Sequence, residues 1–225
     1  MMTNSNSIYQ LMKIHLFLIL FCLCSCSQQD NFAEVFAKCK ANKKSATPND
    51  LHAELMAEFA TYKCIRGANG PDITATSIDN TIINTLATDD QAVVLYYWSI
   101  PLPNTPSNYA KYDYENILAL NILSEKYKGR VRFIGFSPND TKSVKQFITE
   151  YPFNFPQVAN ADSLWAPLFS EPVGGPPIGG PIILFINTNG KVTYAFSGSY
   201  TNASKTIQRY KPVLEACLTN SVYID

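Results

Sequence analysis

The sequence predicts an α/β domain preceded by a short helical extension, and three observations favour this class. Residues 92–98 form an unbroken apolar run, which is typical of a strand buried on both faces. Residues 131–136 form a second strand pattern after a stretch with helical periodicity. Residues 181–186 and 191–196 flank the turn signal Asn-Thr-Asn-Gly, which predicts a β-hairpin.

The N-terminal residues predict an export signal. Lys13 precedes a nearly continuous apolar run over residues 14–24. This run of roughly 11 residues is too short for a membrane span of about 20 and suits the core of a signal peptide. Translation from Met12 instead of Met1 would give a normal short basic start, and both starts stay open. We expect the mature protein to leave the cytoplasm.

Residues 23–26, Leu-Cys-Ser-Cys, resemble the lipobox of bacterial lipoproteins. The resemblance implies that Cys26 receives the lipid and becomes the first residue of the mature chain. Ser27 in place of Asp resembles the signal for sorting to an outer membrane, and residues 162–164 resemble a glycosylation signal of Bacteroidetes lipoproteins. A lipid-anchored, periplasm-facing protein is therefore implied. A plain secretory signal peptide is the alternative.

The overall composition is that of an ordinary globular protein. The chain is 46% hydrophobic and 16% charged, and its formal net charge is zero. Nucleic-acid binding through a basic surface is therefore not expected, because that binding depends on many Lys and Arg contacts to phosphates. We divide the chain into the signal at 1–26, a helical extension at 27–66 and a main domain at 67–220.

The extension over residues 27–66 is expected to be a helical hairpin. Apolar residues recur at intervals of three and four on both sides of a break at residues 45–50. Asn49 or Asp50 can cap the second helix.

Three cysteines remain after the signal and the lipid site are set aside: Cys39, Cys64 and Cys217. An odd number in an oxidising compartment allows one disulfide and a spare thiol, or three free thiols. A bridge between Cys39 and Cys64 is possible, although antiparallel helices would tend to separate these positions. Both outcomes stay open.

The main domain alternates strands and helices. A short hairpin is expected with its turn at Asp79 and Asn80, and Asp140 or Thr141 is expected to cap a helix. The other expected elements are a strand at 92–98, a helix at 106–127, a strand at 131–136, the hairpin described above and a helix at about 204–218.

This order resembles the thioredoxin fold, and more narrowly the exported TlpA/ResA group and related redoxins. The segments that carry the resemblance are 70–73, 97–99, 134–137 and 181–186. The resemblance implies a three-layer fold with a central mixed sheet. It also implies that Pro181 is the family's cis-proline, which borders a substrate groove.

The redox cysteines of that group are missing here. Aligned on Trp98, they fall at Leu102 and Thr105. Disulfide exchange needs one thiolate to attack and a second to resolve the mixed disulfide, and these two side chains can do neither. A second alignment, to the peroxiredoxin motif, places Pro101 and Thr105 correctly but puts Asn108 at the peroxidatic position. Both alignments lack the nucleophile.

No metal site or cofactor is expected. His52 is the one histidine after the signal, and no Cys or His spacing suits zinc. We therefore expect a thioredoxin-like protein without dithiol catalysis, which binds another envelope protein or peptide. The alternatives are an oxidoreductase that uses relocated cysteines (Cys39, Cys64, Cys217) and a purely structural envelope lipoprotein.

Overall fold

The computed structural model describes residues 31–42, 51–86, 90–101, 107–169 and 181–224, which all belong to one compact unit, Asn31–Asp225. Its helices are α2 (Phe32–Ala41), α3 (Leu51–Cys64), α4 (Ser107–Lys126), α5 (Thr141–Glu150), α6 (Asp162–Trp165), the 3₁₀-helix η1 (Ala166–Phe169) and α7 (Ala203–Thr219). Its strands are β1 (Thr74–Thr76), β2 (Ile82–Asn84), β3 (Ala92–Tyr97), β4 (Val131–Phe136), β5 (Gln157–Val158), β6 (Ile182–Ile186) and β7 (Val192–Ser197).

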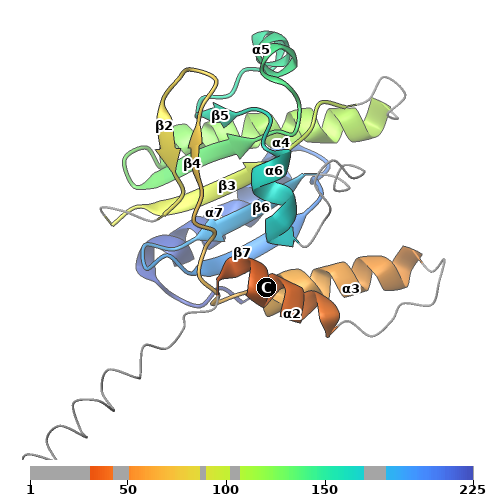
Figure 1. The fold of residues 1–225 in the computed structure, drawn as a ribbon, viewed down its shortest axis with the longest axis vertical. Helices are drawn as coiled ribbons and strands as arrows, with labels where there is room; N and C mark the ends of the chain where they lie inside the picture. Colours follow the sequence, from red (N-terminus) through yellow and green to blue (C-terminus); the bar gives the residue numbers. More distant parts are fainter. Residues whose placement is uncertain (1–30, 43–50, 87–89, 102–106, 170–180, 225) are drawn as a thin grey trace, which may run out of the picture. The chain divides into compact units, whose positions relative to one another are not determined.

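A five-stranded mixed sheet forms the centre, with the strand order β5-β4-β3-β6-β7 (Figure 1). β3 runs parallel to β4 and antiparallel to β6, and β5 and β7 pair at the two edges. All six residues of β3 are buried, as the unbroken apolar run predicts. The predicted α/β class with a central mixed sheet is confirmed.

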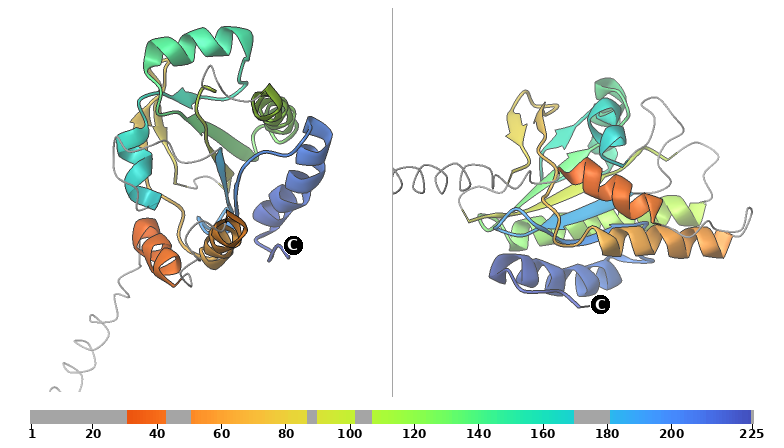
Figure 2. Two further views of the ribbon diagram at one scale, coloured as in Figure 1. Left: turned by 90° about the vertical axis from the view of Figure 1, so that its right-hand side faces the viewer. Right: turned by 60° about the horizontal axis from the view of Figure 1, so that its bottom comes forward.

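Helices cover both faces of this sheet, and each face has its own apolar core. One core packs α4 and α7 against the sheet, with Leu120, Leu123 and Leu214 fully buried. The other packs α2, α6 and η1, where the Phe36 and Phe169 rings lie 4.8 Å apart. Figure 2 shows these helices on either side of the sheet, so the three-layer arrangement is confirmed.

The β1–β2 hairpin is a separate two-stranded sheet beside the β5 edge. Thr76 pairs with Ile82, and Asn80 takes a positive φ of 64° in the turn, where the sequence predicts one. The amide of Ile78 donates to the Gln157 carbonyl at 2.8 Å. This bond attaches the hairpin turn to β5.

The N-terminal extension differs from the predicted antiparallel hairpin. Cys39 lies near the end of α2 and Cys64 at the end of α3, yet their Cα atoms are only 5.8 Å apart and their sulfurs form a disulfide. The carboxyl ends of the two helices therefore meet, whereas an antiparallel hairpin would put the end of one beside the start of the other. Among the described helices, none is long and apolar enough to cross a membrane.

Candidate functional site

The candidate site lies between the end of β3 and the start of α4, where the sequence predicts the altered redox motif. Residues 98–101 of this connection are described, and 102–106 are not. Leu102 and Thr105 therefore lie outside the described residues, as does Cys26. Asn108 lies in the first turn of α4, but its side chain is also outside the described set.

Trp98, the first residue after β3, is fixed from three directions. Its amide donates to the Phe136 carbonyl at 2.9 Å, and its indole Nε1 donates to Gln157 Oε1 at 2.9 Å. Its ring packs against Phe147 and Phe153 at centroid distances of 5.1 and 4.9 Å. The start of the connection is thus rigidly placed although it carries no reactive group.

The next residues are held by the loop after β4. The amide of Ile100 donates to Asn139 Oδ1 at 2.9 Å, and the same oxygen accepts from Ser137 Oγ at 3.1 Å. Asp140, which follows, caps α5 by accepting from the amides of Lys142 and Ser143. Two loops that are distant in sequence therefore form one surface at this end of the sheet.

A small cavity of about 30 Å³ lies beneath this connection. Its lining residues are Tyr96, Trp98, Ser99, Pro101, Asp113, Ile117, Phe147 and Pro181. Pro181 therefore lines the same cavity as the end of β3. No peptide bond between described residues is cis. The bond before Pro181 begins at residue 180, outside the described residues, so its cis form stays a prediction.

Asp113 of α4 is the charged group of this cavity. Its carboxylate accepts a hydrogen bond from Ser199 Oγ at 2.7 Å. Burial raises the pKa of Asp113 above its ordinary value, and the Ser199 hydrogen bond partly opposes this rise. Asp113 thus gives the cavity wall one acidic group, which is held by the Ser199 hydroxyl.

Behind Asp113 lies a buried polar cluster made of Tyr96, Asn116 and Tyr210. Asn116 and Tyr210 are 0% exposed, and both amide atoms of Asn116 and the Tyr210 hydroxyl have no hydrogen bond of normal geometry with any described residue. Burial raises the pKa of both tyrosines, and the nearby Asn116 amide partly opposes the rise.

Sequence reasoning missed this cluster. The available signal was the spacing of Asn116 with Leu120, Leu123 and Tyr127, which places a polar residue on the apolar stripe of α4.

None of the three cysteines predicted to survive maturation lies in this site. Cys39 and Cys64 form the disulfide of the extension, and Cys217 on α7 is free but only 1% exposed. Burial raises the pKa of Cys217 to about 12, and Thr193 partly lowers it. Among the described residues, no group of three His, Cys, Asp or Glu side chains could hold a metal ion. The described part of the site offers hydrogen bonds and one carboxylate.

The fold is thioredoxin-like. It is similar to a Chlorobium tepidum structure described as a thiol:disulfide interchange protein DsbE, with 17% identity, a TM-score of 0.52, and coverage of 68% of this chain and 97% of that one. It is also similar to the peroxidoxin BcpB from Mycobacterium tuberculosis, with 18% identity, a TM-score of 0.52, and coverage of 67% and 96%.

A third similar structure is the C-terminal domain of a Bacteroides thetaiotaomicron protein described as a thiol-disulfide oxidoreductase. Its identity is 16% and its TM-score 0.51, with coverage of 69% of this chain and 97% of that domain. No family model matches the chain, and no curated protein matches it. At these identities the likeness establishes the fold and leaves the activity to the residues of the site.

Proposed function

We propose that this chain is a membrane-anchored, extracytoplasmic thioredoxin-like protein that has no dithiol catalysis and acts as a binding or assembly module. The observation that carries this proposal is the absence of any cysteine between Cys64 and Cys217. Disulfide exchange requires a thiolate within bonding reach of the substrate sulfur. The connection between β3 and α4 has no sulfur to supply one.

The binding surface would be the one that the two loops form above Asp113. Trp98 and Ile100 are fixed by hydrogen bonds to β4, β5 and the loop after β4, so the surface is held in one shape before a partner arrives. A pre-organised surface loses less entropy on binding. Pro181 and Leu102 would border the groove for a protein or peptide partner, and no nucleic acid or cofactor would be required.

The test is a pair of activity assays on the mature protein. We expect no reduction of insulin with dithiothreitol and no consumption of hydrogen peroxide above background. The variant Leu102→Cys with Thr105→Cys restores the pair and is expected to gain a measurable dithiol, because the start of α4 can lower the pKa of the first thiol. The matched control, Leu102→Ser with Thr105→Ser, is expected to stay inactive.

One observation favours the relocated-cysteine alternative. Cys64 is an exposed residue, whereas its disulfide partner Cys39 is only 7% exposed, so Cys64 is the end of the bridge nearer to solvent. Insulin reduction by the wild type that disappears in Cys39→Ser with Cys64→Ser would favour this alternative. Activity that survives the loss of Cys39, Cys64 and Cys217 together would overturn the non-catalytic proposal and the relocated-cysteine alternative.

The membrane anchor has its own test. Cells given radiolabelled palmitate should label the wild-type chain and leave Cys26→Ala unlabelled, and Cys24→Ala should still be labelled. The lipid would supply membrane affinity of roughly 0.8 kcal/mol per buried CH₂ group. Label on the Cys26 variant would contradict the lipid anchor and, with it, the proposed location at an outer membrane facing the periplasm.

A further inference from the structure

The outer edge of β4 is only partly covered by β5. β5 pairs with Gly135 and Phe136, so Val131 to Ile134 have no strand on that side. Backbone groups alternate along a strand between its two neighbours. The carbonyls of Arg130 and Phe136 accept from residues 92 and 98 on the β3 side, so the odd-numbered residues of β4 direct their N–H and C=O groups to the outer edge.

One of these outward amides has no partner. The amide of Val131 donates to the Tyr127 carbonyl at 3.0 Å, that of Gly135 to Pro156 at 2.9 Å, and that of Ser137 to Val158 at 2.8 Å. No described residue accepts from the amide of Phe133, although this residue is only 4% exposed. A buried backbone N–H without a partner is rare in folded proteins.

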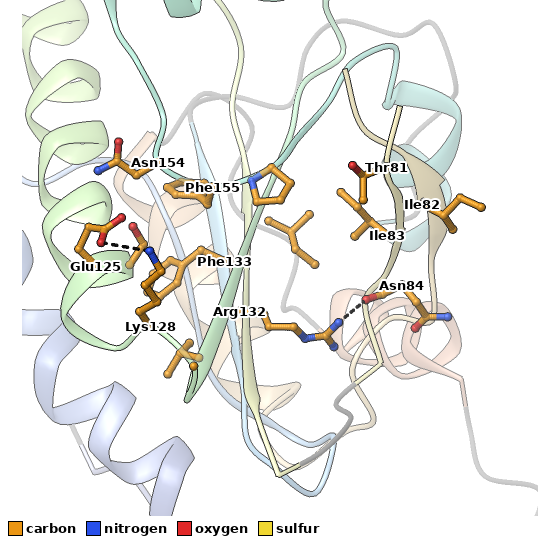
Figure 3. Close-up of a pocket in the computed structure, with 15 residues that line it drawn as sticks. Thr81, Ile82, Ile83, Asn84, Glu125, Lys128, Arg132, Phe133, Asn154 and Phe155 are labelled. Atoms are coloured by element: carbon orange, nitrogen blue, oxygen red, sulfur yellow. Dashed lines mark hydrogen bonds and ion pairs between the residues drawn. The ribbon is translucent and has the colours of Figure 1, made fainter. Parts of the chain in front are cut away.

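Phe133 lines a cavity of about 350 Å³, which is the cavity drawn in Figure 3. Its walls come from the β4 edge, the end of α4, the segment before β5, and β2. Thr81 and Ile83 point toward the cavity, whereas Ile82 points away and is 76% exposed. The Arg132 guanidinium crosses to the hairpin and donates to the Asn84 carbonyl at 3.1 Å and to that of Leu86.

We infer that this cleft binds an extended peptide segment of another protein, which adds as a short strand to the outer edge of β4 at Phe133. Another backbone is the group that supplies an acceptor for the Phe133 amide and a donor for its carbonyl together. The uncovered edge runs from the bond at Val131 to the bond at Gly135, roughly 13 Å at about 3.3 Å per residue. About four residues of an extended chain span that length.

The surroundings of the edge favour a loose segment over a second copy of this chain. The cleft has a wall on each side of β4, with residues 81–84 of the hairpin on one and residues 154–156 on the other, so the space beside Phe133 suits a single extended segment. None of the residues that line this cleft also lines the small cavity beside Trp98. The inference therefore stands or fails separately from the proposed binding surface after β3.

The experiment uses ¹⁵N-labelled full-length chain in detergent and an acetylated, amidated pentapeptide of alternating valine and threonine, residues that favour strands. We expect a saturable downfield shift of the Phe133 amide proton. A peptide N-methylated at its central residue loses one hydrogen-bond donor, and its affinity should fall at least about tenfold.

Two protein variants test where the peptide binds. Thr81→Trp fills the cleft and should abolish the shift. Ile82→Trp, whose side chain points away from the cleft, should retain it.

Three results would overturn the inference. The first is an unchanged Phe133 amide at millimolar peptide, which would leave ordered water as its partner. The second is a shift that persists in Thr81→Trp, because the peptide would then bind elsewhere. The third is a shift that grows with protein concentration in the absence of peptide, which would make a second copy the occupant.

Discussion

Two buried polar groups near the carboxyl end of β3 differ in how their hydrogen bonds are satisfied. The indole of Trp98 donates to Gln157 Oε1 at 2.9 Å, and the amide nitrogen of Gln157 donates onward to the Phe155 carbonyl at 3.0 Å. By contrast, the amide of Asn116 and the hydroxyl of Tyr210 have no partner of normal geometry among the described residues. The indole N–H of Trp98 and the side-chain amide of Gln157 thus have hydrogen-bond partners, whereas the polar atoms of Asn116 and Tyr210 have none of normal geometry among the described residues.

The two groups should therefore contribute to the free energy of unfolding with opposite signs. A hydrogen bond contributes about 0.5–1.5 kcal/mol, whereas a buried polar group without a partner costs about 1–3 kcal/mol. The Trp98–Gln157 pair therefore stabilises the fold, and the Asn116–Tyr210 pair weakens it unless water or a ligand completes its bonds. Mutations in the two groups should have opposite effects on the free energy of unfolding.

The largest effect is expected for Gly135→Ala. A Cβ atom there would lie 2.0 Å from Gln157 Oε1, and the Gln157 side chain is only 2% exposed and held by two hydrogen bonds. Making room means overpacking and losing the bond to Trp98. We expect the free energy of unfolding to fall by about 3 kcal/mol. Urea titration measures it, and a loss below about 1 kcal/mol would show that Gln157 moves freely.

A smaller loss is expected for Gln157→Leu. The indole N–H of Trp98 then stays buried without an acceptor, at a cost of about 2 kcal/mol in the free energy of unfolding. The matched control is Trp98→Phe combined with Gln157→Leu, which removes donor and acceptor together. In a double-mutant cycle the coupling should exceed about 1 kcal/mol, and purely additive losses would contradict a hydrogen bond of this strength.

Ser199→Ala should act on Asp113 in a pH-dependent way. Burial raises the pKa of Asp113 in the folded state, so the folded protein holds this proton at higher pH than the unfolded chain. Stability is therefore lost as pH rises from the unfolded value of 3.8 through the raised one. Removing the Ser199 bond raises this pKa further.

We expect Ser199→Ala to lower the free energy of unfolding by about 1 kcal/mol at pH 7, and by less at pH values below the Asp113 pKa. Urea titrations across this pH range, with Asp113→Asn as the control that cannot titrate, would measure the difference. An equal loss at every pH would exclude the carboxylate as its cause.

The smallest effect is expected for Tyr210→Phe. This change removes a buried hydroxyl that makes no hydrogen bond of normal geometry with a described residue, and it keeps the ring that packs 5.0 Å from Phe185. The free energy of unfolding should stay the same or rise by up to about 1 kcal/mol. Tyr127→Phe is the control, because that hydroxyl donates to Glu215 at 2.7 Å and its loss should destabilise. Equal destabilisation by both variants would mean that the Tyr210 hydroxyl has a partner after all.

The sequence predicts the main elements because their signals are local. β4 has the predicted bounds, and Asp140 caps α5 as one of two candidates. The short α6 and η1 were missed, since four residues each are too few for a helical period. The direction of α2 against α3 was also missed, because apolar spacing gives each helix and not its orientation.

The sequence could indicate where the candidate site lies, but not the hydrogen bonds and buried polar residues that form it. The end of β3 and Pro181 could be placed together by their resemblance to a known fold, and they line one cavity. The bond between Trp98 and Gln157 joins residues far apart in sequence, and no spacing rule could reveal it. The spacing of Asn116 places it on the apolar stripe of α4, but only the packing shows that its amide is fully buried and what surrounds it.

The disulfide between α2 and α3 also decides how the chain would respond to a pulling force. Tension applied at Asn31 would reach Cys39 after a few residues and pass through the sulfur bridge to Cys64. The segment between them, a sequence separation of 25 residues, would carry no load. Reducing the bridge would release roughly 80 Å of slack, which is the extended length of this segment at about 3.4 Å per residue less the 5.8 Å between the two Cα atoms. While the bridge is intact, it therefore limits how far the chain can extend between Asn31 and Cys64.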